Sequence, residues 1–202
     1  MTTVALADLT DRVGFIDPAG GKAALKRTAS RSADIVVAQD AAMRVFVLHA
    51  WAGRIPTTAH TDRIFKLVDD WKPLQLGIDA SAMQSLYYDS LMREARQRGK
   101  RLPLLAVKMV TDKTAYIRSV LQPVVAEGRL FVQAGQRELW QEIEAFPSGM
   151  TMDLADALAH AIALLPKRPA VQQAHEERSA HLRYLEQSNA PRYYINQVAK
   201  AS

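Results

Sequence analysis

Short runs of apolar and β-branched residues alternate along this chain with stretches in which apolar residues recur every few positions. A short run is typical of a buried strand, and the wider spacing indicates an amphipathic helix. The runs predict strands at Val13–Asp17, Asp34–Ala38, Arg44–Trp51, Leu74–Asp79, Leu104–Lys108 and, as a short edge strand, Gly128–Val132. Helical spacing covers Thr57–Trp71, Ser81–Arg98, Asp112–Val125, Glu138–Phe146 and Met152–Leu165.

The order of these elements predicts an α/β fold with a mixed sheet. A short polar link joins the second and third strands, which is a hairpin signal. We therefore expect three antiparallel strands first, then parallel strands alternating with helices that flank the sheet. Pro166 and Pro169 mark a boundary. One domain is expected over residues 1–165, followed by a basic tail over 166–202 with a weak helix near 171–187 and an extended end.

The composition excludes several kinds of site. The chain has 202 residues and no cysteine, which rules out a disulfide scaffold, a zinc ribbon, an iron–sulfur site and a thiol nucleophile. No apolar run approaches the ~18 residues of a membrane span. Acidic residues stand where a signal peptide would be basic. The histidines show no zinc-ligand spacing, and we expect His160 to be a packed residue.

The net charge of +5 is unevenly distributed. Residues 93–137 hold ten basic residues against three acidic ones, and the tail from Pro166 holds six against three. A second basic island contains Lys22, Lys26, Arg27 and Arg31, with no acid among them. Such segregation suggests a phosphate-binding face beside an acidic site. Solvated helix faces are the alternative interpretation.

Acidic residues stand where apolar elements end or begin. Asp17 ends the first strand, Asp79 ends the fourth, and Asp153 and Asp156 open the last helix. Acids at the ends of adjacent strands would lie ~5 Å apart, where they repel each other unless a cation lies between them. Oxygen ligands suit Mg²⁺ or Mn²⁺, and two such ions ~4 Å apart can promote hydrolysis of a phosphodiester.

Each acid also has an ordinary structural interpretation. Asp17 precedes Pro18 and could start a turn. Asp79 could cap the helix that follows it, and Asp153 could complement a helix dipole. The combination of these acids, in this order and with a hairpin between the first two, favours a metal site.

Together these residues resemble the C-terminal nuclease domain of the large terminase subunit of tailed bacteriophages. The matching stretches are Gly14–Ala19, Ser32–Val37, Val45–Arg54, Leu76–Ser81, Thr111–Lys113, Ile117–Arg118, Glu127–Phe131, Glu144–Gly149 and Asp153–Ala157. They span about residues 12–165. The resemblance implies a ribonuclease-H-like fold and an endonuclease of the bacterial host cytoplasm. Such an enzyme cuts concatemeric double-stranded viral DNA by a two-metal mechanism.

The resemblance also implies roles for particular residues. Asp17, Asp79 and Asp153 would be catalytic and hold Mg²⁺ or Mn²⁺, with Asp156 as a further metal ligand and Asp153 preferred over it. The family often has glutamate at the position of Asp79, a difference of one methylene. Lys113 and Arg118 match a family stretch that contacts DNA. The basic clusters add further candidates for the DNA backbone: Lys22, Lys26, Arg27 and Lys108.

The implied partners are double-stranded DNA, a terminase ATPase domain or chain, the small terminase subunit and the portal protein. Gly21-Lys22 is followed by Ala23, and Ile16 stands where a phosphate-binding loop has glycine, so we expect no translocating ATPase within this chain.

Two alternatives stay open. The first is a non-catalytic module that docks on the portal or the ATPase chain. In that case aromatic and basic residues of the tail would serve protein contacts or DNA stacking: Arg183, Tyr184, Arg192, Tyr193 and Tyr194. The second is another ribonuclease-H-like enzyme, such as a junction resolvase, against which the Glu144–Gly149 link argues by analogy.

Overall fold

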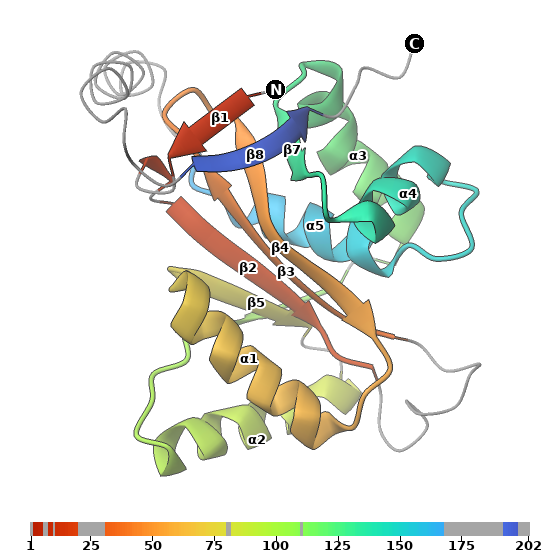
Figure 1. Ribbon diagram of the computed structural model, residues 1–202. Coiled ribbons are helices and arrows are strands. Elements are labelled where there is room, and N and C mark those ends of the chain that lie inside the picture. The colour runs from red at the N-terminus through yellow and green to blue at the C-terminus, as the bar shows by residue number, and fades with distance from the viewer. Residues whose placement is uncertain are drawn as a thin grey trace.

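An eight-stranded mixed sheet runs through the protein, with helices on both faces (Figure 1). The computed structural model describes residues 2–5, 8–9, 11–19, 31–79, 82–109, 111–167 and 192–197. The strands are β1 (Thr2–Ala5), β2 (Asp11–Asp17), β3 (Ser32–Gln39), β4 (Val45–Gly53), β5 (Gln75–Asp79), β6 (Leu104–Val107), β7 (Leu130–Gln133) and β8 (Arg192–Gln197). Their order across the sheet is β1-β8-β7-β4-β3-β2-β5-β6.

The five neighbouring strands from β4 to the edge strand β6 have the ribonuclease-H-like arrangement. Strands β2, β3 and β4 are antiparallel neighbours, β5 lies parallel to β2, and β6 lies parallel to β5. This order and these directions confirm the mixed sheet that the sequence predicts, with three antiparallel strands followed by parallel ones. The carboxyl ends of β2, β5 and β6 therefore meet at one edge of the sheet, as they do in any parallel set.

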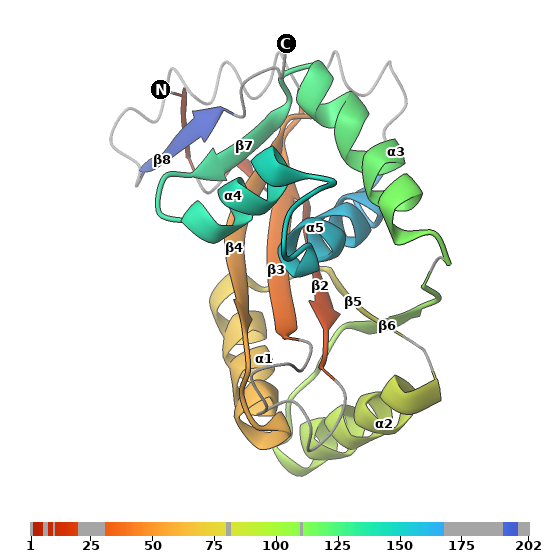
Figure 2. The same cartoon turned by 90° about the vertical axis from the view of Figure 1, so that its right-hand side faces the viewer.

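Five helices cover the two faces. They are α1 (Thr57–Trp71), α2 (Ala82–Gln97), α3 (Lys113–Ala126), α4 (Arg137–Ala145) and α5 (Asp153–Ala163). Figures 1 and 2 show α1 and α2 on one face, and α3, α4 and α5 on the other. Strand β3 is buried along its whole length because both of its faces are covered. Ile35 and Val37 belong to the core under α5, whereas Val36 and Ala38 belong to the core under α1 and α2.

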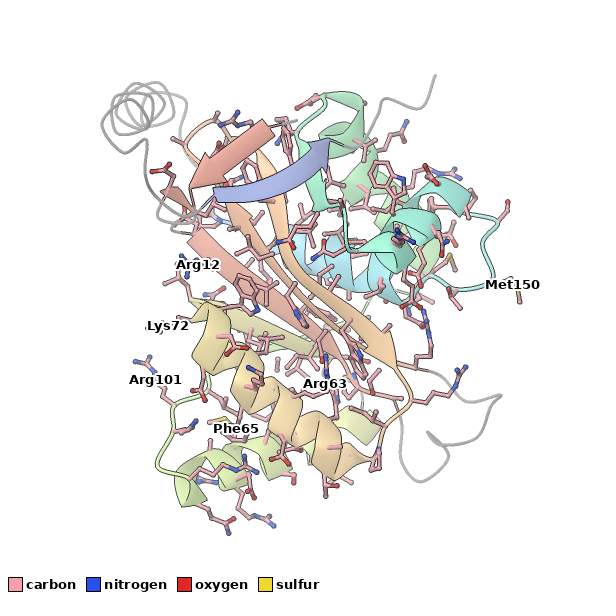
Figure 3. All side chains as sticks on the ribbon, in the orientation of Figure 1. Arg12, Arg63, Phe65, Lys72, Arg101 and Met150 are labelled. Carbon is pink, nitrogen blue, oxygen red and sulfur yellow. The ribbon has the colours of Figure 1, made fainter. Side chains whose placement is uncertain are left out.

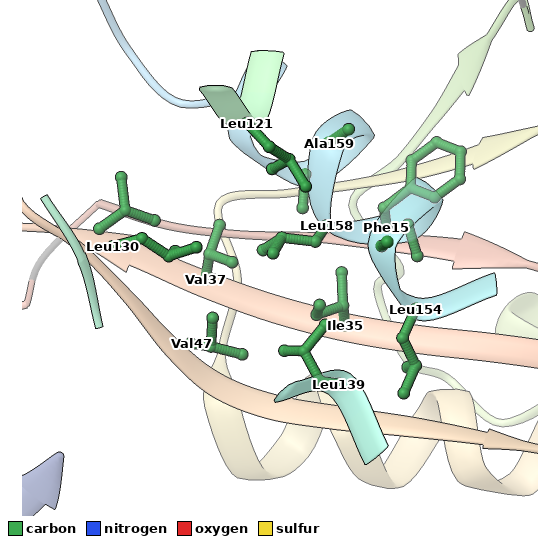
Figure 4. Close-up of a cluster of buried hydrophobic side chains, with 14 of the residues drawn as sticks. Phe15, Ile35, Val37, Val47, Leu121, Leu130, Leu139, Leu154, Leu158 and Ala159 are labelled. Carbon is green, nitrogen blue, oxygen red and sulfur yellow. The ribbon is translucent and has the colours of Figure 1, made fainter. Parts of the chain in front are cut away.

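Helix α5 is the most buried of the helices and crosses β2 and β3. It is mostly apolar, as expected for a helix enclosed by other elements. Leu154 and Leu158 pack with Phe15 and Ile35 from the sheet (Figure 4). This packing sets the position of the first turn of α5 over the carboxyl end of β2.

One strand differs in place from its prediction. Strand β7 is not an edge strand, because it lies between β4 and β8. Its second neighbour, β8, comes from the tail and pairs with β1 on its other side. The predicted loop at residues 20–30 and the weak helix near 171–187 lie outside the described residues. No helix in the described part of the chain is long and apolar enough to cross a membrane.

Candidate active site

Asp17 and Asp79 stand side by side at the carboxyl ends of β2 and β5. Ile16 pairs in register with Ile78, and each acid is the next residue of its strand. The two backbones are therefore about one strand spacing apart, ~5 Å.

Both acids face the helix α5. Asp17 follows Phe15 by two residues, and side chains two apart in a strand share a face. Phe15 lies in the core under α5. Gly77 precedes Asp79 by two residues, and a Cβ at Gly77 would lie 2.7 Å from the Phe15 ring and 2.8 Å from Leu164. Only glycine lets β5, β2 and the end of α5 approach so closely.

Asp156 faces the same region from the first turn of α5. Its side chain is fully buried, and its Oδ2 atom lies 2.7 Å from Nζ of Lys113. Lys113 is the first residue of α3, whose start is fixed by Asp112, because the Asp112 side chain accepts a hydrogen bond from the amide of Ala115. Asp156 of α5 and Lys113 of α3 therefore both lie at the end of the sheet where β2 and β5 end.

The electrostatics show that these acids act on one another. Burial raises the pKa of Asp17 to about 7. The nearby charge of Lys113 opposes this shift, while the charges of Asp156, Asp79 and Asp153 add to it. Burial and carboxylate repulsion both disfavour the ionised form. Burial is the largest of these effects, and the neighbouring carboxylates act in the same direction.

Asp153 is turned toward a different partner. Its Oδ2 atom accepts a hydrogen bond of 2.8 Å from Nε of Arg31, the residue that precedes β3. Arg31 also pairs with Glu138 and Glu142 of α4. Of the two acids in the first turn of α5, Asp156 is the one paired with Lys113 beside Asp17, whereas the sequence analysis prefers Asp153 as the third ligand.

The donor set suits a hard divalent cation. Carboxylate oxygens are the ligands that Mg²⁺ and Mn²⁺ prefer, and the pKa of Asp17 is raised by burial and, in addition, by the charges of Asp156, Asp79 and Asp153. As the side chains stand, no three His, Cys, Asp or Glu residues of the described ranges lie close enough together to hold one ion. Lys113 supplies the positive charge beside Asp156.

His160 is a packed residue, as the sequence predicts. Its ring stacks on Phe15 at 4.6 Å and meets Tyr116 at 4.5 Å between ring centroids. Burial lowers the pKa of His160, although the charge of Asp156 opposes the shift. The uncharged ring packs beside Asp156, and its Nε2 atom lies 3.7 Å from Oδ1 of that acid.

The basic residues divide between two ends of the sheet. Lys108 is exposed directly after β6, whose last residue pairs with Asp79, so it lies at the same end of the sheet as the acids. Arg101 lies before β6, at the opposite end of that strand. Figure 3 shows it near Lys72 and Arg12, where β2 begins. The segment 93–137 is therefore not one continuous basic face.

The remaining DNA-binding candidates are placed as follows. Lys113 is held at the acidic edge by Asp156. Arg118 is exposed on α3 and borders a groove of about 460 Å³ with Phe146 and Pro147, away from the carboxylates. Lys22, Lys26 and Arg27 lie outside the described residues. Arg31, the last member of that island, is engaged by three carboxylates.

Sequence reasoning missed three buried acids: Asp40, which pairs with Arg44 in its own turn, Glu142 and Asp34. Glu142 shares the buried side of α4 with Leu139, three residues earlier, and an acid on the apolar stripe of a helix is a signal that could have revealed it. Asp34 lies on the face of β3 that points to α1, and its Oδ1 atom is 2.6 Å from Nε2 of His60. An acid inside a β-branched run was the only signal for that pair.

No protein-family model and no curated protein matches this sequence. Solved structures share its chain path at low identity. A nuclease domain of the large terminase subunit gp2 of bacterial virus Sf6, with manganese, is 11% identical, with 81% of this chain and 90% of that chain covered and a TM-score of 0.48. The yeast mitochondrial Holliday junction resolvase Ydc2 is 14% identical, with 86% and 85% covered and a TM-score of 0.47. Thermus thermophilus RuvC in complex with Holliday junction substrate is 15% identical, with 90% and 99% covered and a TM-score of 0.43.

Proposed function

We propose that this protein is a divalent-metal-dependent nuclease, the endonuclease domain of a phage DNA-packaging terminase. It would hydrolyse phosphodiester bonds of concatemeric double-stranded viral DNA. The observation that carries the proposal is the placement of Asp17, Asp79 and Asp156 on one face and at one edge of a ribonuclease-H-like sheet. The motif order seen in the sequence supports the assignment to terminases.

In the proposed site, three elements supply the ligands. Asp17 and Asp79 extend from neighbouring strands, and Asp156 faces them from α5, with Asp153 held by Arg31 at its rim. When bound, two Mg²⁺ or Mn²⁺ ions activate a water and stabilise the leaving oxygen of a phosphodiester. Lys108 and Lys113 carry positive charge at the same edge and hold the backbone phosphates of DNA beside the carboxylates.

The packaging partners follow from the same proposal. They are a terminase ATPase domain or chain, the small terminase subunit and the portal protein. A non-catalytic module is the second candidate. The observation that favours it is the Lys113–Asp156 ion pair, which gives one acid a permanent counter-charge.

Cleavage assays separate these candidates. The purified chain is incubated with supercoiled plasmid, linear duplex and a four-way junction, each with Mn²⁺, Mg²⁺ or EDTA. A terminase nuclease cuts the plasmid and the linear duplex when a metal is present, and a resolvase cuts only the junction. We expect Asp17→Asn, Asp79→Asn and Asp156→Asn each to lose at least ~100-fold in rate, because removing a ligand takes away several kcal/mol of transition-state stabilisation.

Asp70→Asn is the matched control, since Asp70 is exposed on α1 at the other face of the sheet. Asp153→Asn decides which helix acid is the third ligand. Intact DNA with every metal contradicts the nuclease and leaves the non-catalytic module.

A further inference from the structure

The first turn of α5 is capped by a residue of another helix. Met152, at the N-cap position of α5, makes no capping hydrogen bond with its side chain. Instead, Oε2 of Glu142 accepts hydrogen bonds from the amides of Leu154 and Ala155, at 2.8 and 3.0 Å. These amides are among those that a helix start leaves without partners within the helix.

The other oxygen of Glu142 is held by Arg31. Nη2 of Arg31 lies 2.7 Å from Oε1 of Glu142, so both carboxylate oxygens are engaged. The Glu142 side chain is only 3% exposed. Charge-assisted bonds of this kind are about twice as strong as neutral ones, and a negative charge is favourable at a helix N-terminus. Glu142 therefore holds the first turn of α5 in place.

The same arginine separates the two acids of that turn. Nε of Arg31 binds Asp153, while Asp156, three residues on, is paired with Lys113 beside Asp17. Residues three apart on a helix differ by about 60° in direction. A small rotation or fraying of the first turn would therefore exchange which acid faces the strands.

We propose that Glu142, anchored by Arg31, is a positioning residue of the candidate metal site that fixes the first turn of α5 and aims Asp156 at Asp17. This inference rests on the proposed function. Glu142 touches neither substrate nor metal and acts through the backbone of Leu154 and Ala155. Residues that orient the ligands of a metal typically change metal affinity by about 10- to 100-fold when they are replaced.

Mn²⁺ binding to the full chain tests the proposal. Titration calorimetry at 15 °C gives the dissociation constant, and circular dichroism at the same temperature gives the folded fraction. Glu142→Gln keeps the shape of the side chain but loses the charge that binds Arg31. We expect its dissociation constant for Mn²⁺ to rise at least ~10-fold with the folded fraction unchanged. Glu138→Gln is the matched control, because Glu138 pairs with the same arginine from the exposed side of α4. Its dissociation constant should change by less than ~3-fold.

The outcomes separate the two proposals. If the unsubstituted chain binds no Mn²⁺, the proposed function and this inference fail together. If it binds Mn²⁺ and Glu142→Gln binds equally well at a lower melting temperature, Glu142 is only a helix cap and the inference alone is overturned. If Glu142→Gln does not fold at 15 °C, Arg31→Lys takes its place, because lysine keeps the charge but cannot bridge Glu142 and Asp153 at once. Unchanged Mn²⁺ affinity in Arg31→Lys also overturns the inference.

Discussion

Asp17 is the residue through which the candidate site lowers the free energy of unfolding. Its pKa is about 7 in the folded protein against 3.8 without the fold. Between these values the folded chain holds a proton that the unfolded chain has lost. The free energy of unfolding therefore falls as pH rises from about 4 to about 7, and stays low above that. A shift of this size corresponds to at most ~4 kcal/mol.

Asp17→Asn should remove this pH dependence, because asparagine has the shape of the acid without its charge. In EDTA the variant and the unsubstituted chain should have similar stability near pH 4. The variant should be more stable by about 1–3 kcal/mol at pH 8. Thermal unfolding followed by circular dichroism across pH 4–8 measures the difference, with Asp70→Asn as the exposed control. Equal stability at pH 8 would show that the fold does not disfavour the ionised form of Asp17.

Lys113 is the complementary residue, since it neutralises an acid that is fully buried. Lys113→Met keeps much of the apolar stem but leaves Asp156 without its cation. Removing one partner of a buried pair typically costs about 3–5 kcal/mol. Because 46% of the Lys113 side chain is exposed, solvent screens part of the loss. We expect a decrease in stability of about 1–2 kcal/mol at pH 8 in EDTA.

Mn²⁺ gives this substitution a second readout. The melting temperature of Lys113→Met should rise more on addition of Mn²⁺ than that of the unsubstituted chain, because a cation replaces the missing charge. Lys66→Met, in an exposed pair with Asp70 on α1, is the control. An equal Mn²⁺-induced rise in both proteins would contradict a shared cation position.

At the scale of elements, the periodicity of the sequence determines most of what is seen. The helix at Thr57–Trp71 is found with the bounds predicted, and the acids at 17 and 79 end their strands as expected. Two features could not be predicted. The inner position of β7 depends on β8, which follows it by about sixty residues. The role of Glu142 depends on Arg31, 111 residues earlier. Local patterns carry no information about such distant partners.

Gly77 links the strands to α5 and gives a test of this arrangement. In Gly77→Ala the new Cβ would lie 2.7 Å from the Phe15 ring and 2.8 Å from Leu164, which is closer than side chains tolerate. Phe15 is fully buried and cannot move aside without disturbing the core. We expect a loss of about 1–3 kcal/mol in urea unfolding. Gly135→Ala, where nothing lies within 4 Å of the new atom, should change stability by less than ~0.5 kcal/mol. Similar effects in both variants would show that β2, β5 and α5 are not so closely packed.

At the scale of the molecule, the sheet separates two polar systems. The carboxylates and Lys113 lie on the α5 face, whereas Asp34 and His60 are buried on the α1 face. Arg63 extends the second system to the surface, with its guanidinium 3.8 Å over the ring of Trp51. Because the sheet lies between them, substitutions on the α1 face are expected to affect stability rather than metal binding.

The division of basic residues between the two ends of the sheet predicts where DNA binds. If phosphates lie beside the carboxylates, Lys108 contacts the DNA backbone and Arg101 does not. Both residues are exposed, but they lie at opposite ends of strand β6. Each phosphate contact releases condensed counterions, so its loss weakens binding and lowers the salt dependence.

For duplex DNA in Ca²⁺, an ion expected to permit binding without cleavage, Lys108→Gln should bind about 3- to 10-fold more weakly at low salt. The slope of log K against log salt should fall by about one. Arg101→Gln should change neither quantity beyond the general effect of one unit of charge. Fluorescence anisotropy from 50 to about 200 mM salt measures both quantities. Equal losses for the two variants would mean that DNA is attracted by net charge alone, whereas a larger loss for Arg101→Gln would place it at the end of the sheet where β2 begins, away from Asp17 and Asp79.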